Sequence, residues 1–257
     1  TEGEVTRAKD NILAAYEKAA NGADTRKNGE FVNPLINHFF SNYSFMEPAT
    51  RLELVKTIFS QINATVMNQI LAQGFADENS LVVVYSGPEK EGIATPTAGQ
   101  LLQVIDEVKK AEIEAPAADA VTEPLMDPST LKGGNVKKTS KTVYGATEWI
   151  LSNGAKVVVL PTDHKKDQIL FSFYKAGGQS LIPTEDLASF DASIFGAFQS
   201  VQGLSKFKGT DLTKVLSGKM VSVSPFIDNL YNGVSGNSSV KDLETAFQLL
   251  YLNYVDP

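Results

Sequence analysis

The sequence predicts an α+β protein, a mixed α/β sandwich in which a helix-rich part with a short sheet is followed by a mostly antiparallel sheet backed by helices. Three observations support this class. Apolar residues between 4 and 111 recur at three- and four-residue spacings, which places them on one face of a helix. Asn153-Gly154 separates two β-rich runs, which is the pattern of a hairpin. Ser or Thr precedes an acidic residue by three positions at two expected helix starts.

Four amphipathic helices are expected before residue 75. They cover residues 4–20, residues 30–41, a segment beginning at Thr50, and a segment from Asn63 or Ala64 to a stop at Gly74. Pro34 falls in the first turn of the second helix, where a missing N–H costs little. Thr50 and Glu53 form an expected capping box at the start of the third.

A short strand and a fifth helix follow. The run from Leu81 to Ser86 is continuously apolar and ends at Gly87-Pro88, which is typical of a strand covered on both faces. This strand is expected to belong to the short sheet of the N-terminal part. Thr97 to Ala111 is the fifth helix, built on Leu101, Leu102, Ile105 and Val108.

The composition changes between the helical part and the second sheet. Three prolines at 116, 124 and 128 lie among small and polar residues, and Gly133-Gly134 follows. We interpret residues 116–147 as an interdomain linker, with residues 1–115 and 148–257 as the domains on either side. Lys137-Lys138 is expected to lie in a solvated loop.

The elements after residue 147 alternate between strands and helices. Asn153-Gly154 predicts a type I′ turn, in which both residues have positive φ. The third run, Ile169 to Tyr174, alternates in a way that buries one face of a strand. The remaining elements are a helix from Thr184 to Phe195, a short helix at 211–216, strands at 220–224 and 227–234, and a helix that starts at a Ser239–Asp242 capping box.

Composition excludes several classes of function. The chain has 257 residues, a net charge of −7 and no cysteine. No segment is basic enough to bind nucleic acid, and no apolar run approaches the roughly 20 residues of a membrane span. The lack of cysteine excludes disulfides and thiolate metal sites but does not fix the compartment. Because the chain begins with Thr1 and is already amphipathic at Val5, we expect it to be a piece of a longer protein.

The residues that bear chemistry do not form a recognisable catalytic motif. His38 and His164 are the only histidines, and no H-x-x-x-H or H-x-x-E-H occurs. The polar turn 163–167 is interpreted as a solvated loop, and His38 as a core or boundary residue. The acidic residues of the helix from Thr184 are expected to complement its dipole rather than to form a carboxylate pair; they are Glu185, Asp186 and Asp191.

Several motifs in the second half nevertheless resemble those of one family. They are Trp149-x-Leu151-Ser152-Asn153-Gly154-x-Lys156-Val157-Val158, Gly177-Gly178 and Lys219-x-Val221-Ser222-Val223, with Glu4-x-x-Arg7-Ala8-Lys9 in the helical part. Their order resembles the pitrilysin/insulinase-type (inverzincin) zinc metallopeptidases. The resemblance implies that the chain spans the end of the second domain, the linker between halves and the first part of the non-catalytic third domain.

The resemblance also shows what is missing. In the catalytic domain of the family, the helix after the glycine pair carries H-x-x-E-H. The matching slots here hold Ser189, Ala192 and Ser193. Serine is a poor zinc ligand and alanine cannot act as a base. Ser189 or Ser193 as a nucleophile would also need a base, and no histidine is near in sequence. We therefore expect no catalytic, metal-binding or cofactor-binding residue in this chain, and zinc only in the catalytic domain of the parent protein.

The resemblance implies a role in the parent and leaves alternatives open. The first hypothesis is the non-catalytic middle of a zinc metalloendopeptidase, forming wall and hinge of a chamber that closes on a peptide. Its partners are then the peptide substrate and the other domains of the same chain, and for a bacterial parent we expect a periplasmic or other extracytoplasmic location. A catalytically silent structural or partner subunit is the second hypothesis, and an unrelated α+β binding domain is the third. Apolar edges left exposed would make the isolated chain self-associate.

Overall fold

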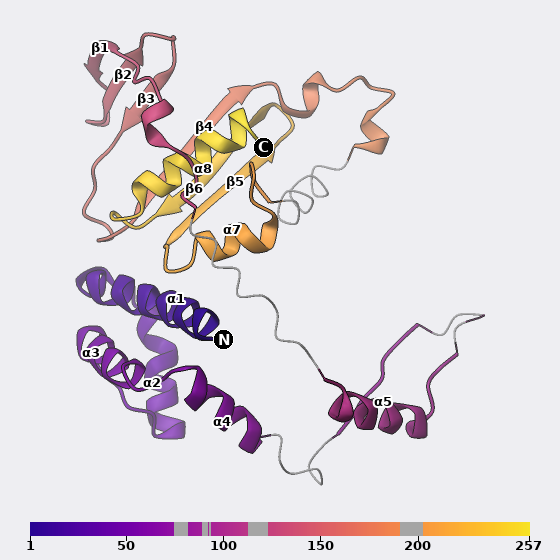
Figure 1. The fold of residues 1–257 in the computed structure, drawn as a ribbon. Helices are drawn as coiled ribbons and strands as arrows, with labels where there is room; N and C mark the ends of the chain where they lie inside the picture. The colour runs from indigo at the N-terminus through magenta and orange to yellow at the C-terminus, as the bar shows by residue number, and fades with distance from the viewer. Residues whose placement is uncertain (75–81, 89–91, 93, 113–122, 191–202) are drawn as a thin grey trace. The chain divides into compact units, whose positions relative to one another are not determined.

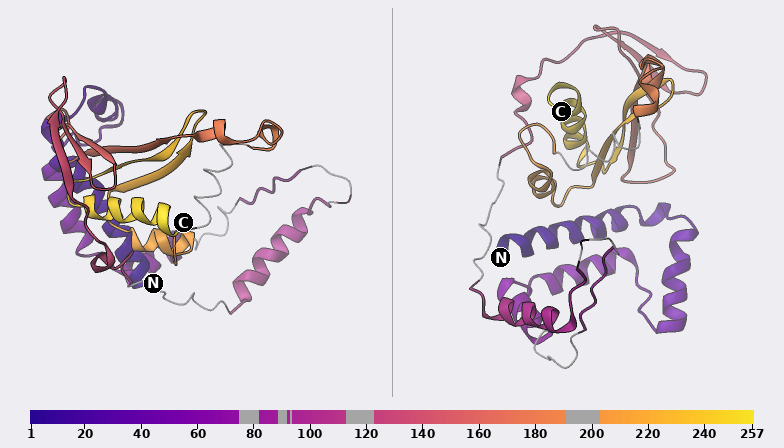
Figure 2. Two further views of the ribbon diagram at one scale, coloured as in Figure 1. Left: turned by 90° about the horizontal axis from the view of Figure 1, so that it is seen from above. Right: turned by 90° about the vertical axis from the view of Figure 1, so that its right-hand side faces the viewer.

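The computed structural model describes residues 1–74, 82–88, 92, 94–112, 123–190 and 203–257. It confirms the α+β class, with α-helices and two antiparallel three-stranded sheets (Figures 1 and 2). The chain divides into two compact units, Thr1–Val5 with Ile62–Asp119, and Thr6–Gln61 with Ala120–Pro257. These units group residues by contact and do not test where a domain of a longer protein ends. The boundaries at 115 and 147 therefore stay a prediction.

The five expected helices of the N-terminal part are present. They are α1 (Glu2–Asn21), α2 (Gly29–Ser41), α3 (Pro48–Phe59), α4 (Ala64–Gly74) and α5 (Ala98–Lys110). Thr97 and Gln100 form a capping box at the start of α5, with Gln100 Oε1 accepting from Thr97 N at 2.8 Å. The capping box expected at Thr50 is wrong. Helix α3 begins two residues earlier because Pro48, with its fixed φ, occupies the first helical position. No helix among the described residues is long and apolar enough to cross a membrane.

The strand expected at residues 81–86 is not formed by the part of this run that the structure describes. Residues 82–88 have no strand assignment, and the side chains of Val82 and Val84 are both 82% exposed. A strand requires a hydrogen-bonded neighbour, and no described residue pairs with this run. The sequence pattern shows that the segment is suited to the interior of a sheet, but it does not show whether neighbouring strands are present.

The first sheet, β1–β2–β3, is an antiparallel meander in the order of the chain. Its strands are β1 (Val136–Lys141), β2 (Thr147–Leu151) and β3 (Lys156–Val159). Strand β1 lies inside the expected linker, so the solvated loop expected around Lys137 is wrong. Lysine side chains are exposed along it, and an edge strand needs only backbone hydrogen bonds to one neighbour.

The expected hairpin between β2 and β3 is confirmed, but its turn type is not. Gly154 has φ 87°, whereas Asn153 does not have positive φ. Gly154 N donates to Leu151 O at 3.0 Å, and Asn153 Oδ1 accepts from Ala155 N at 3.0 Å. The turn is therefore not type I′. One glycine with positive φ after a tight turn is the pattern of a three-residue hairpin loop.

The second sheet has the order β4–β6–β5 and is antiparallel throughout. Its strands are β4 (Ile169–Ala176), β5 (Val221–Ile227) and β6 (Tyr231–Ser238). The antiparallel partner expected at 227–234 thus begins four residues later. Helix α8 (Leu243–Val255) lies along one face of this sheet (Figures 1 and 2).

Aromatic pairs join α8 to β4. Phe171 stacks on Phe247 with ring centroids 5.9 Å apart, and Phe173 meets Tyr254 edge to face at 5.2 Å. Leu170 and Tyr174 alternate with these residues and stay exposed. The alternation of the sequence is confirmed, because one face of β4 packs on a helix and the other does not.

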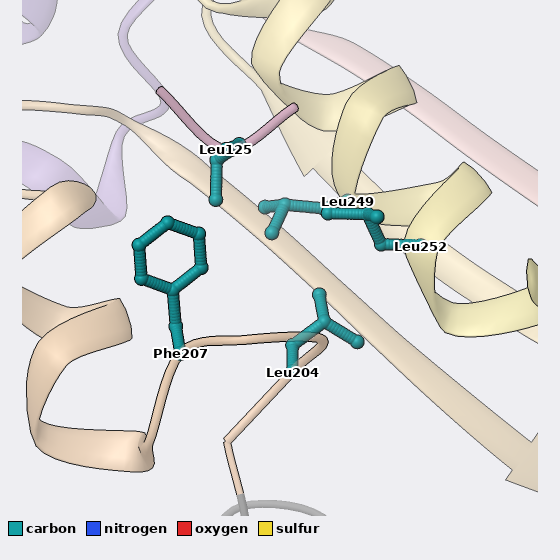
Figure 3. Close-up of a cluster of buried hydrophobic side chains, with 5 residues drawn as sticks. All are labelled: Leu125, Leu204, Phe207, Leu249 and Leu252. Atoms are coloured by element: carbon teal, nitrogen blue, oxygen red, sulfur yellow. The ribbon is translucent and has the colours of Figure 1, made fainter. Parts of the chain in front are cut away.

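A cluster of buried apolar side chains lies in this part of the chain. Its buried members come from three separate segments: Leu125, Leu204, Phe207, Leu249 and Leu252 (Figure 3). The short helix α7 (Gly209–Val215) and strand β5 add partly buried side chains around it. Full burial of one leucine or phenylalanine side chain stabilises a fold by about 2 kcal/mol. This cluster therefore holds α7, β5 and α8 together.

A buried carboxylate fixes the start of α8. Asp242 is 2% exposed, and its Oδ2 accepts from Met220 N at 2.8 Å and from the Ser239 hydroxyl at 2.7 Å. Asp242 N in turn donates to Ser239 Oγ at 3.2 Å. One half of the expected Ser239–Asp242 capping box is thus formed. The carboxylate bonds to the residue before β5 instead of to the Ser239 backbone N–H. The helix α8 therefore begins at Leu243, after this residue.

Candidate functional site

Two glycines with unusual backbone angles follow β4 and begin the segment that leads to Ser189. Gly177 has φ 146° and Gly178 has φ 66°. Gly177 N donates to Leu230 O at 2.8 Å, and Gln179 N donates to Asp228 O at 2.9 Å. The chain can approach the β5–β6 turn this closely only without side chains, because a Cβ at Gly178 would lie 2.1 Å from Asp228 O. The glycine pair therefore docks this segment on the second sheet.

The α-helix expected from Thr184 is not formed over residues 184–190. A turn closed by Asp186 N on Pro183 O at 2.9 Å is followed by one 3₁₀ turn, η5 (Leu187–Ser189). Leu187 is 40% exposed, so this residue does not supply the apolar packing from which most helices in proteins draw their stability. Ser189 is exposed. Ala192 and Ser193 lie outside the described residues, as does Asp191.

The two histidines lie in separate and exposed settings, so the expectation that His38 is a core or boundary residue is wrong: the residues around it on α2 are exposed as well. His38 Nδ1 is 2.6 Å from Tyr43 O, just beyond the end of α2. His164 Nδ1 is 3.8 Å from an Asp163 carboxylate that is itself fully exposed. The described part of the chain contains no group of three or more His, Cys, Asp or Glu residues suited to hold a metal ion. The expectation that this chain binds no metal stays a prediction.

The structure gives the β3–β4 loop a role that the sequence did not indicate. Three consecutive residues of this loop contact the end of α1 and the start of α2. Lys165 Nζ is 3.2 Å from Glu30 Oε1, and Lys166 Nζ is 2.6 Å from Asp24 Oδ2. Lys166 N also donates to Thr25 Oγ1 at 3.0 Å. Asp167 is the third of these residues. We call the contacts that these loop residues make the polar seam.

Asp167 joins three segments that are far apart in sequence. Its carboxylate accepts from Asn21 Nδ2 and from Val240 N, both at 2.9 Å. Its own φ is 53°, a conformation that aspartate tolerates better than most residues. A third ion pair also belongs to the polar seam, with Lys241 Nζ 2.8 Å from Glu17 Oε2. The sequence interpretation of this loop as solvated was incomplete. The charges are exposed, but they are paired with residues about 140 positions away.

The ion pairs of the polar seam shift the pKa values of their members. The hydrogen bond from Lys166 lowers the pKa of Asp24, and the hydrogen bond from Lys165 lowers that of Glu30. The Glu17 hydrogen bond raises the pKa of Lys241. A lowered carboxyl pKa stabilises the fold above the unfolded pKa, and this contribution is lost as the pH falls through the folded pKa. A raised lysine pKa stabilises the fold below the unfolded pKa and is lost as the pH rises through the folded value. The polar seam is therefore weakened at both acidic and strongly alkaline pH.

Changing Lys166 to alanine should raise the pKa of Asp24 toward its ordinary value, because both the hydrogen bond and the nearby charge are removed. Titration of the carboxyl resonances by NMR measures this directly. Asp127 is the control, since its pKa is lowered by Ser129 rather than by a lysine and should stay where it is. An Asp24 pKa that does not move in the variant would contradict the pairing.

Comparison with known proteins adds evidence on relationship. No family model matches the chain. Over 255 residues it is 22% identical to a protein of Arabidopsis thaliana named "Zinc protease PQQL-like", and the match covers 98% of this chain and 23% of that protein. The chain therefore spans about a quarter of the length of this relative.

Two solved structures also match over the whole chain. One is the periplasmic protease PqqL from Escherichia coli, with a TM-score of 0.48 and 15% identity. The other is a mutant of the ferredoxin protease FusC in complex with Arabidopsis ferredoxin, with a TM-score of 0.47 and 17% identity. In each case the match covers 28% of the other chain. The sequence similarity to a zinc protease confirms the expected resemblance: this chain is similar to a segment of a pitrilysin/insulinase-type zinc protease.

Proposed function

We propose that this chain is the non-catalytic middle segment of a zinc metalloendopeptidase, where it forms part of the wall and hinge of a chamber in which peptides are cut. One observation carries the proposal. The similarity to a zinc protease extends over 98% of the chain, yet the slots of the zinc motif hold Ser189, Ala192 and Ser193. A segment that keeps the order of the family's motifs without its donor atoms supports catalysis performed elsewhere.

The chemistry of the donor set supports this assignment. A catalytic zinc takes about three protein ligands from His, Cys, Asp or Glu and leaves one position open for water. The sequence has no cysteine and two histidines, and His38 and His164 are 126 positions apart. Zinc would therefore be bound by residues outside this chain. Peptides and the other domains of the same protein are the partners that this role implies.

The polar seam is consistent with a hinge. It connects the segment between the end of α1 and the start of α2 to the loop that precedes β4, through exposed polar groups. Exposed ion pairs each contribute only about 0–1 kcal/mol. Contacts of this kind hold two elements together and still permit them to separate, which apolar packing does not.

Zinc content and peptide cleavage test the proposal. The isolated 257-residue chain and the full-length protein of its gene are each dialysed against a zinc buffer and analysed by mass spectrometry of the metal. We expect about one zinc per full-length chain and none on the isolated segment. The full-length protein should cleave a mixed peptide library and the isolated segment should not. The cleavage should stop when a chelator is added.

The two outcomes that contradict the proposal are distinct. Stoichiometric zinc on the isolated segment, or metal-dependent cleavage by it, would mean that the segment has donors of its own. A full-length protein with neither zinc nor activity would instead identify a catalytically silent partner or scaffold subunit, the second hypothesis from the sequence.

A further inference from the structure

The smaller compact unit has no apolar core among its described residues. It contains α4, the extended run 82–88 and α5, and not one of these residues is buried. The apolar residues of both helices and of the run are exposed by 44% or more in the following cases: Ile70, Leu71, Val82, Val83, Val84, Tyr85, Leu102, Val104 and Val108. Isolated helices of 11 and 13 residues are marginal without packing of their apolar face. The unit therefore has apolar helix faces that would normally pack on a core, but the element on which they would pack is absent from the described residues.

The run 82–88 indicates what kind of element would complete this core. Val82 and Val84 point to one face of an extended chain, and Val83 and Tyr85 to the other. All four are apolar, which is the pattern of a strand with neighbours on both sides and both faces covered. The segment has no hydrogen-bonded strand as a neighbour among the described residues. A single covering helix would leave its backbone groups unpaired, so the missing element must itself contain strands.

The length of the relative indicates where these strands are. The chain matches 23% of the zinc protease, so more than three quarters of a protein of that length lies outside these 257 residues. The described strands within the chain already form two sheets of their own. We infer that Val82–Tyr85 is an interior strand of a third sheet, whose other strands belong to the same polypeptide outside this chain and whose face is covered by α4 and α5. This inference rests on the proposed function, because it requires the longer protein.

Thiol labelling tests the inference, because the chain contains no cysteine. Val84→Cys probes the run and Val108→Cys probes the apolar face of α5. Lys110→Cys is the matched control, since it lies two residues away on the opposite, polar side of the same helix. Each variant is reacted with N-ethylmaleimide, both as the 257-residue chain and within the full-length protein, and the labelled peptide is quantified by mass spectrometry. All three side chains are at exposed positions in the isolated chain, so the substitutions do not disturb its folding.

The expected result is that labelling of Val84→Cys and Val108→Cys slows by about tenfold or more in the full-length protein, as burial in a stable core predicts. Lys110→Cys should react at the same rate in both. Equal rates for all three variants would overturn the inference.

Protection of Val84→Cys already in the 257-residue chain would also overturn it, because the covering strands would then come from this chain or from a second copy. Sedimentation distinguishes those two sources. Neither readout depends on zinc or on peptide cleavage, so this inference and the proposed function fail separately.

Discussion

Replacing Phe207 by alanine should lower the free energy of unfolding by about 4 kcal/mol, the usual range for a buried phenylalanine being about 3–5 kcal/mol. Phe207 is 5% exposed and lies in the cluster with Leu125, Leu204 and Leu249 (Figure 3). The cluster joins segments distant in sequence, so the cavity cannot close by a local adjustment. Urea unfolding followed by far-UV circular dichroism measures the change.

Phe39→Ala is the matched control for this experiment. The Phe39 side chain is 81% exposed at the end of α2, although the sequence pattern places it on an apolar helix face. Its removal should change the free energy of unfolding of the isolated chain by less than about 0.5 kcal/mol. A loss at Phe39 as large as that at Phe207 would show that the α2 face is covered in solution, and would argue for the self-association expected from the sequence.

Replacing Gly178 by alanine should destabilise the fold by at least about 2 kcal/mol, the combined result of strain at positive φ and a steric clash. The φ of Gly178 is 66°, and the added Cβ would meet Asp228 O at 2.1 Å and Tyr231 N at 2.7 Å. These are backbone atoms of the β5–β6 turn, so no side-chain rotation relieves the contact. The turn, and with it the docking of the segment that leads to Ser189, should loosen.

The control is Gly133→Ala, at a position where an added Cβ has no atom within 4 Å and φ is not positive. This change should be neutral or slightly stabilising, because alanine reduces the freedom of the unfolded chain. The midpoint of urea unfolding separates the two variants. If Gly178→Ala were as stable as Gly133→Ala, the close approach between Gly178 and the β5–β6 turn would not exist in solution.

Most secondary structure was predicted where its cause is local. The helices α1, α2, α4 and α5 follow from apolar spacing and from capping residues such as Thr97 and Asn63, whose side chains bond within three residues. The hairpin β2–β3 follows from Asn153-Gly154, because glycine tolerates the positive φ that a tight turn requires. The turn type was wrong because it depends on φ at Asn153, which the residue type does not determine.

Predictions that depend on a distant partner were less successful. Lys137-Lys138 was expected to lie in a solvated loop, but residues 136–141 pair with β2 as an edge strand. The run 82–88 was predicted to be a strand and is unpaired among the described residues. In both cases the residue types describe how a segment would fit a sheet, and the presence of a neighbouring strand decides whether it does.

The candidate site shows the same division. The lack of zinc donors at Ser189, Ala192 and Ser193 was visible in the sequence, because ligand chemistry depends on residue type. The polar seam was not, although Asp167 and the lysines before it were singled out as a group. Their partners at Asn21, Asp24 and Glu30 lie more than 130 positions away, and no local pattern links the two segments.

The sequence by itself determined the α+β class, the helix and hairpin segments, and the resemblance to a zinc protease family without a recognisable zinc motif in this chain. These properties follow from side-chain chemistry and from periodicities of a few residues. Only the tertiary structure decided which strands pair, which apolar faces are buried and which charges meet across the chain. Hydrogen bonding between strands and the burial of side chains are relations between segments brought together in space, and the order of residues along one segment does not contain them.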